Sequence, residues 1–229
     1  MAMTMPFSIL DSTDMQLFSV GDSVHFQLTI DENQAIAYNF ILQGKGTLPN
    51  YNDSWDDEYI QLDIGEIFND ASFLDLDSNN VSLSDSDGKF RFISYIFTRC
   101  PMPAMCPAVI SKNRYLAEAF LKNVELEFIL VSFDYIYDKP SVMKSRYKSH
   151  AETYPNLKFY SSFNHLNDIF MMAGQSNVSF WGVNENDIGH TLRSVIIDPE
   201  RRLLKAYDGM NWRPQEVEWE INNILQAYN

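Results

Sequence analysis

Both cysteines of the chain lie in one short proline-rich segment. They are Cys100 and Cys106, with five residues between them, and the segment also holds Pro101, Pro103 and Pro107. Thiols this close indicate a redox pair or a soft-metal site, because both need two sulfurs side by side. The alternative is that both are small buried hydrophobic residues. The prolines disfavour it, since they fit a rigid exposed loop better than a core strand.

Two kinds of chemistry suit this pair. Cu(I) is a soft ion that prefers sulfur and also accepts imidazole, so two thiolates and one histidine make a suitable three-coordinate site. The five-residue spacing also lets the chain bend back far enough for a disulfide, which needs Cα atoms roughly 4.4–6.8 Å apart. Cys106 lies at the expected start of a helix, where free backbone N–H groups should lower the pKa of its thiol. Oxidation of the pair would remove the metal site, so copper loading would require prior reduction.

The elements around the cysteines follow the pattern of an α/β domain. Expected strands are 81–83, 90–98, 126–133, 157–160, 192–197 and 203–207, and expected helices are 107–122, 141–154, 165–172 and 214–227. The order βαβα, then a hairpin, then a helix predicts a thioredoxin-like fold, with a central sheet flanked by helices. In that fold reactive cysteines sit where the first central strand turns into its helix, which is where Cys100 and Cys106 fall.

His190 is the candidate third ligand. It immediately precedes the expected strand 192–197, at the sheet end where a thioredoxin-like fold places a loop opposite the cysteine segment. We assign His25, His150 and His165 to surface or packing roles, which most histidines have. Asp134 and Asp138, in a loop after a strand, we interpret as turn or cap formers without chemistry.

The sequence before the main domain is different in kind. Residues 1–43 contain two strand-like pieces, 23–30 and 35–42, around a polar turn, and we expect a small β unit. Residues 44–62 have linker composition, with Gly44, Gly46, Pro49 and an acidic run. The predicted organisation is therefore a β segment at 1–43, an acidic linker at 44–62 and the thioredoxin-like domain at 63–229.

The charge balance excludes some partners. The chain has 31 acidic and 17 basic residues and a formal charge of -14. Such a surface repels phosphate backbones, so we expect no nucleic-acid partner. No stretch approaches the roughly 18 apolar residues of a membrane-spanning helix. The first Lys or Arg is Lys45, so no export signal is visible.

Several segments of the main domain together resemble the Sco/SenC family. They are Phe-Thr-Arg-Cys-Pro-Met-Pro-Ala-Met-Cys-Pro at 97–107, Val-Ser-Phe-Asp at 131–134, Gly-His at 189–190 and Val-Ile-Ile-Asp-Pro-Glu at 195–200, with 64–67 and 81–89 upstream. The resemblance covers about residues 63–229 and implies copper ligands at Cys100, Cys106 and His190. One departure is the cysteine spacing, because the usual family motif has three intervening residues where this chain has five.

The resemblance also implies a function and a location. Members of the family are copper-binding proteins held outside the cytoplasm, where they help to build the dinuclear copper centre of cytochrome c oxidase. The implied partner is the copper subunit of that oxidase or another cuproprotein, and the implied cargo is Cu(I) or Cu(II). For a periplasmic or other extracytoplasmic location we expect an export signal in a segment upstream of Met1, where a membrane anchor could also lie.

The amino end carries a second resemblance. Met3-Thr-Met5-Pro-Phe together with Gly-Asp-Ser-Val-His-Phe at 21–26 is similar to the end of a CusF-type copper-binding barrel, in which thioethers bind Cu(I). The first strand of such a barrel is absent here. Met3 and Met5 are therefore either copper ligands or ordinary strand residues, and the sequence favours neither.

Three functions fit these residues. The first is a metallochaperone that binds copper and passes it to a cuproprotein, and the soft ligand set favours it. The second is a thiol–disulfide oxidoreductase that acts on partner cysteines through Cys100 and Cys106. The third is a copper or redox sensor. A peroxidase is a poorer match, because peroxide reduction uses a single cysteine in a Thr- and Arg-rich pocket.

Overall fold

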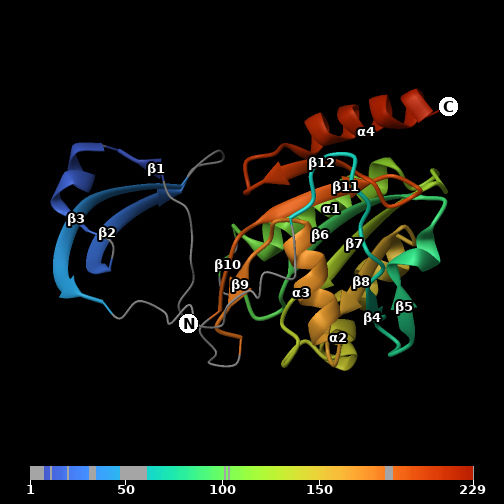
Figure 1. The fold of residues 1–229 in the computed structure, drawn as a ribbon, viewed down its shortest axis with the longest axis horizontal. Coiled ribbons are helices and arrows are strands. Elements are labelled where there is room, and N and C mark those ends of the chain that lie inside the picture. The colour runs from blue at the N-terminus through green and yellow to red at the C-terminus, as the bar shows by residue number, and fades with distance from the viewer. Residues whose placement is uncertain are drawn as a thin grey trace. The chain divides into compact units, whose positions relative to one another are not determined.

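The structure is a computed structural model that describes residues 8–10, 12–19, 21–30, 35–46, 61–100, 102, 104–183 and 188–228. These residues form two compact units, one from the described residues up to 46 and one from those after 60 (Figure 1). Residues 47–60, most of the predicted linker, lie outside the described ranges, and so do Met3 and Met5. Among the described residues, no helix combines the length and the apolar composition needed to cross a membrane.

The smaller unit is a three-stranded sheet in the order β1-β3-β2. Its elements are β1 (Ser8–Ile9), the 3-10 helix η1 (Ser12–Leu17), β2 (Asp22–Ile30) and β3 (Ala35–Lys45). β2 and β3 pair antiparallel, and β1 pairs with β3 in parallel. The strands predicted at 23–30 and 35–42 are therefore present, with β3 reaching a few residues further.

The larger unit is built on a seven-stranded sheet in the order β12-β11-β6-β7-β8-β4-β5. Its strands are β4 (Ser72–Leu74), β5 (Asn80–Ser82), β6 (Phe90–Ile96), β7 (Leu126–Ser132), β8 (Leu157–Ser161), β11 (Arg193–Ile197) and β12 (Leu203–Asp208). Its helices are η2 (Leu83–Ser86), α1 (Cys106–Ala119), α2 (Pro140–Thr153), α3 (Leu166–Gln175) and α4 (Pro214–Tyr228). A separate two-stranded sheet joins β9 (Phe180–Trp181) to β10 (Gly189–His190).

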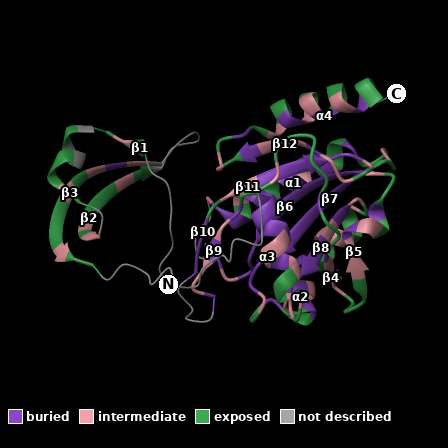
Figure 2. Cartoon of the chain, viewed as in Figure 1, coloured by how far each residue is buried: buried purple, intermediate pink, exposed green. Residues whose placement is uncertain are grey.

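Helices cover both faces of the central strands. Every residue of β6 and β7 is buried, the charged Arg91 and Glu127 included, as expected for central strands with helices on both faces (Figure 2). Neighbouring residues of β6 point to opposite faces: Ser94 accepts a hydrogen bond from Asn113 of α1, whereas the Tyr95 hydroxyl donates to Met172 O of α3. Successive crossovers from β6 through β7 to β8 carry α1 and α2 over the same face, because such crossovers are right-handed.

The predicted α/β architecture is thus confirmed, and the carboxyl end of β6 leads directly to Cys100. The strands that sequence analysis did not predict are short ones, namely β1, β4, β9 and β10. Three of these have only two residues, too few to show an alternation of apolar and polar side chains. The β9–β10 pair nevertheless carries the candidate ligand His190.

Candidate metal centre

A buried cluster of carboxylates fixes the end of β6 just before the cysteine segment. Asp138 is fully buried and accepts hydrogen bonds from Thr98 N at 2.8 Å, from the Thr98 hydroxyl and from Ser132 Oγ at 2.5 Å. Burial raises the pKa of Asp138, although the bonds from Ser132 and Thr98 act in the opposite direction. These contacts tie β6 to the loop after β7.

Asp134 makes the second attachment. Its side chain is fully buried and accepts a hydrogen bond from Arg99 Nε at 2.6 Å and one from Tyr137 N at 3.1 Å. The Arg99 guanidinium also lies 4.9 Å from the centre of the Tyr137 ring. Both aspartates therefore hold the residues that precede Cys100, so their interpretation as simple turn formers understates their role.

We call these five residues the carboxylate cluster: Thr98, Arg99, Ser132, Asp134 and Asp138. The signal that could have revealed it is the i, i+4 spacing of two aspartates at the carboxyl end of a buried strand.

The two cysteines are buried side by side. Cys106 is the first residue of α1 and is 1% exposed, while Cys100 is 9% exposed, and both are free thiols. The expectation of an exposed loop is wrong for the two cysteines, because both are buried, as are the neighbouring Phe97 and Met105. Pro101 and Pro103, on which that expectation rested, lie outside the described residues.

The two thiols have opposite pKa shifts. The hydrogen bond from the Cys106 thiol is the main cause that lowers the pKa of Cys100 to about 4, and burial opposes it. Burial is the main cause that raises the pKa of Cys106 well above its ordinary value, and the Cys100 sulfur adds to the rise. The predicted low pKa of Cys106 is therefore wrong. Its backbone N–H at the helix start instead stabilises the Cys100 thiolate.

The β9–β10 pair positions His190 beside the cysteines. His190 is 1% exposed, and its ring centre lies 5.4 Å from that of Phe97 and 5.0 Å from that of Phe133. Gly189 precedes it and leaves no room for a side chain, because a Cβ there would lie 2.2 Å from the Trp181 ring. The ring therefore packs against two buried aromatic side chains, and the residue before it has to be small.

The hydrogen bonds of His190 leave one nitrogen with a free lone pair. Nδ1 lies 3.0 Å from Thr191 O. A carbonyl oxygen only accepts, so Nδ1 carries a proton, and in the neutral ring the lone pair is then on Nε2. Nε2 is buried, and with the described residues it makes no hydrogen bond of ordinary geometry, although the ring interacts with the Cys100 thiol and lowers its pKa. A buried polar atom without a hydrogen-bond partner lowers the stability of a folded protein, unless a bound ligand or ion interacts with it.

The structure brings the three predicted ligands together only in part. Cys100 interacts with Cys106, and the His190 ring also lowers the pKa of Cys100, which places it beside that sulfur. Nε2 nevertheless makes no hydrogen bond of ordinary geometry. Over the described ranges, no three His, Cys, Asp or Glu side chains are already close enough to hold a metal ion. The donor set suits a soft ion, but the three groups would have to move closer together to hold it.

Comparisons with known proteins bear on this arrangement. A family model described as SCO1/SenC matches residues 63–226. A search of curated proteins gives no match. Among solved structures, a SCO1/SenC family lipoprotein from Bacillus anthracis is similar with a TM-score of 0.61 and 18% identity, over 72% of this chain and 98% of that chain.

Two further structures are similar to a comparable degree. Arabidopsis thaliana ScoI with copper bound has a TM-score of 0.57 and 20% identity, over 72% of this chain and 100% of that chain. BsSco has a TM-score of 0.57 and 20% identity, over 72% of this chain and 96% of that chain. It is described as a member of the Sco family of cytochrome c oxidase assembly proteins, in which a disulfide switch was identified. At these identities the likeness concerns the fold, and it confirms the thioredoxin-like architecture.

Proposed function

The chain belongs to the SCO1/SenC family, and from this premise we propose that it carries copper on Cys100, Cys106 and His190 and delivers it to another protein. The observation that carries the proposal is the buried Nε2 of His190, which makes no hydrogen bond of ordinary geometry with the described residues, beside a thiol pair in which the pKa of Cys100 is lowered to about 4. A thiolate and an imidazole lone pair are the donors that Cu(I) prefers, and imidazole also suits Cu(II).

Each residue has a distinct part in binding. Cys100 offers a thiolate at neutral pH, because its pKa is lowered. Cys106 has a raised pKa, so it must release its proton when it binds metal, and copper uptake should be coupled to proton release. Thr191 O accepts from Nδ1 and so orients the His190 ring with Nε2 free.

The recipient we propose is the copper subunit of cytochrome c oxidase or another cuproprotein, outside the cytoplasm. This is supported by similar proteins, one of which is described as an oxidase assembly protein and another as a lipoprotein. A copper-bound relative supports the nature of the cargo. The amino-terminal unit as a second copper site, through Met3 and Met5, stays a prediction.

Copper binding to the reduced protein tests this proposal. We expect about one copper per chain in the wild type, and loss of tight binding in Cys100→Ser, Cys106→Ser and His190→Ala. His165→Ala is the matched control, because His165 is a partly buried histidine on another element whose Nδ1 lies 3.6 Å from Asp168. If the reduced wild type takes up no copper, or if His190→Ala binds it as tightly, the proposal is wrong.

A second activity, thiol–disulfide exchange with partner cysteines, is favoured by the lowered pKa of Cys100 alone. This activity would require Cys100 and Cys106 but not His190. Turnover of a disulfide substrate that survives His190→Ala and is lost in Cys100→Ser would support it.

A further inference from the structure

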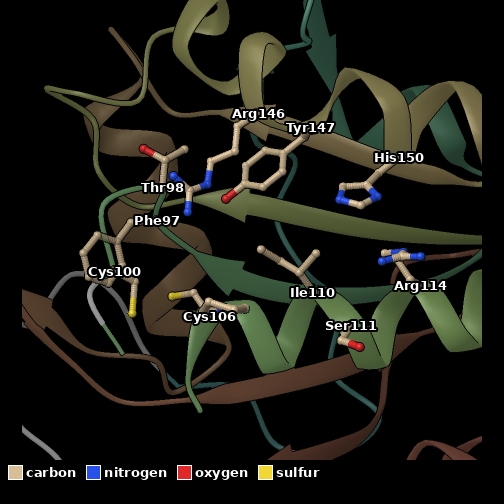
Figure 3. A pocket seen from close by; sticks show the side chains of 11 residues that line it. Phe97, Thr98, Cys100, Cys106, Ile110, Ser111, Arg114, Arg146, Tyr147 and His150 are labelled. Atoms are coloured by element: carbon tan, nitrogen blue, oxygen red, sulfur yellow. The ribbon is translucent and has the colours of Figure 1, made fainter. Parts of the chain in front are cut away.

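A pocket opens beside the cysteine pair, between α1 and α2. Its volume is about 220 Å³, which is smaller than the roughly 300–1,000 Å³ of sites for drug-sized ligands. Figure 3 shows the two sulfurs at one end, with side chains from α1 and α2 facing each other along it. The polar lining from the helices is Ser111, Arg114, Arg146, Tyr147 and His150, and we call this site the arginine pocket.

Within the described part of the chain, both arginines of the pocket lack a carboxylate partner. The chain has eight arginines, all within the described residues, and six of them form ion pairs with Asp or Glu. Among the residues that the structure describes, Arg114 and Arg146 are the two that do not. The Arg114 guanidinium lies 5.9 Å from the Tyr154 ring, and its charge contributes to lowering the pKa of His150, after burial. In a chain of formal charge -14, the pocket is thus a local site of positive charge.

Two further polar atoms of the lining are buried without a partner. The Tyr147 hydroxyl makes no hydrogen bond with any described residue, although Tyr147 is only 3% exposed, and the same holds for Arg114 Nε. Both are hydrogen-bond donors, and buried donors in folded proteins are normally satisfied. The pocket therefore presents two positive charges and two free donors, which together suit a carboxylate.

We propose that the arginine pocket binds the carboxylate of a small thiol and so directs that thiol to the oxidised Cys100–Cys106 pair. The two cysteines line one end of the same pocket, so an anion seated on the arginines can present a sulfur to them. An acidic chain would otherwise repel an anionic thiol from its surface. The inference needs a disulfide between the cysteines, but it does not require copper.

The reaction balances with two molecules of the thiol. The first thiolate attacks Cys100 Sγ, the more exposed sulfur, so that a mixed disulfide forms and the Cys100–Cys106 bond breaks. Cys106 leaves as a thiolate and takes up the proton that the attacking thiol lost. A second thiolate attacks the small-molecule sulfur, which releases the small disulfide and the Cys100 thiolate. Two thiols are oxidised and the protein pair is reduced.

Three thiols of similar size and different charge test the proposal. They are 3-mercaptopropionate, 2-mercaptoethanol and cysteamine, which are anionic, neutral and cationic. With metal-free oxidised protein and rates expressed per thiolate, we expect 3-mercaptopropionate to reduce the disulfide roughly tenfold or more faster than 2-mercaptoethanol, because a charged cleft concentrates counter-ions. The net charge of the protein alone predicts the reverse order.

Variants locate the effect. Arg114→Gln with Arg146→Gln should abolish the preference for the anion, and Arg114→Lys with Arg146→Lys should keep most of it. The matched control is Arg202→Gln with Arg213→Gln, which removes the same charge from two arginine side chains that are 43% and 67% exposed. This control should behave as the wild type.

The proposal is overturned if the wild type shows no preference for 3-mercaptopropionate, if the preference persists in the glutamine double variant, or if no Cys100–Cys106 disulfide can be formed. Copper uptake by the reduced protein is measured separately, so a failure of the copper proposal would leave these rates unchanged.

Discussion

Two regions flank the cysteine pair, and they differ in whether their buried polar groups are hydrogen-bonded. In the carboxylate cluster, Asp134 and Asp138 are fully buried and are each held by several hydrogen bonds. In the arginine pocket, the Tyr147 hydroxyl and Arg114 Nε are buried with none. Fully paired polar groups add rigidity, so the carboxylate cluster supports the structure, whereas unpaired groups suit the ligand that we propose for the arginine pocket.

We expect the largest loss of stability from a substitution in the carboxylate cluster. Asp138→Ala removes the acceptor of bonds from Thr98 and Ser132 and leaves those buried donors unpaired. We expect it to lower the free energy of unfolding by about 3 kcal/mol, measured with urea. Asp138→Asn keeps an oxygen acceptor at that position, so it should cost clearly less. A loss below about 1 kcal/mol in the alanine variant would contradict the assignment of this cluster as a structural support.

The reactivity of Cys100, in the cysteine pair between the two regions, should depend on pH in a characteristic way. The pKa of Cys100 is lowered to about 4, so above that pH it is a thiolate. Its alkylation by iodoacetamide should therefore be nearly constant from about pH 6 to 8, whereas an ordinary thiol of pKa about 8.5 reacts roughly tenfold faster per pH unit.

Cys106→Ala removes the hydrogen bond that is the main cause of the low pKa of Cys100. In this variant the rate at about pH 6 should fall by up to a hundredfold and should rise steeply with pH. A wild-type rate that already rises tenfold per unit would show that Cys100 is an ordinary thiol.

We expect the smallest change in stability from a substitution in the arginine pocket. Tyr147→Phe removes a hydroxyl that has no hydrogen-bond partner, so the free energy of unfolding should stay within about 0.5 kcal/mol of the wild type. Tyr95→Phe is the matched control, because the Tyr95 hydroxyl donates to Met172 O at 2.9 Å and lies 2.6 Å from Ser176 Oγ. It should lose about 1–1.5 kcal/mol. Equal losses in the two variants would remove the contrast between paired and unpaired groups.

What the sequence could predict depends on how locally each feature is determined. The long apolar runs at β6 and β7 and the cysteines at the start of α1 are local in the chain, and they were predicted. His190 was placed from its position before β11, although the β9–β10 pair that holds it has two residues in each strand and shows no periodicity. Which cysteine would ionise depends on burial and on their mutual hydrogen bond, and the helix-start argument alone chose the wrong one.

The arginine pocket was beyond sequence reasoning for a different reason. Arg114 lies on α1 and Arg146 on α2, and the two meet only because β6, β7 and β8 are successive parallel neighbours that bring both helices to one face. Nothing in the sequence marks these two arginines as the ones without acidic partners. That property emerges from the ion pairs that the other six form.

X-ray absorption spectroscopy of the copper-loaded, reduced protein tests the central claim most directly. We predict a first shell of about two sulfur atoms and one imidazole nitrogen in the wild type, loss of the nitrogen in His190→Ala, and an unchanged shell in His165→Ala. A shell without two sulfurs, or an imidazole signal that persists in His190→Ala, would contradict copper binding by Cys100, Cys106 and His190.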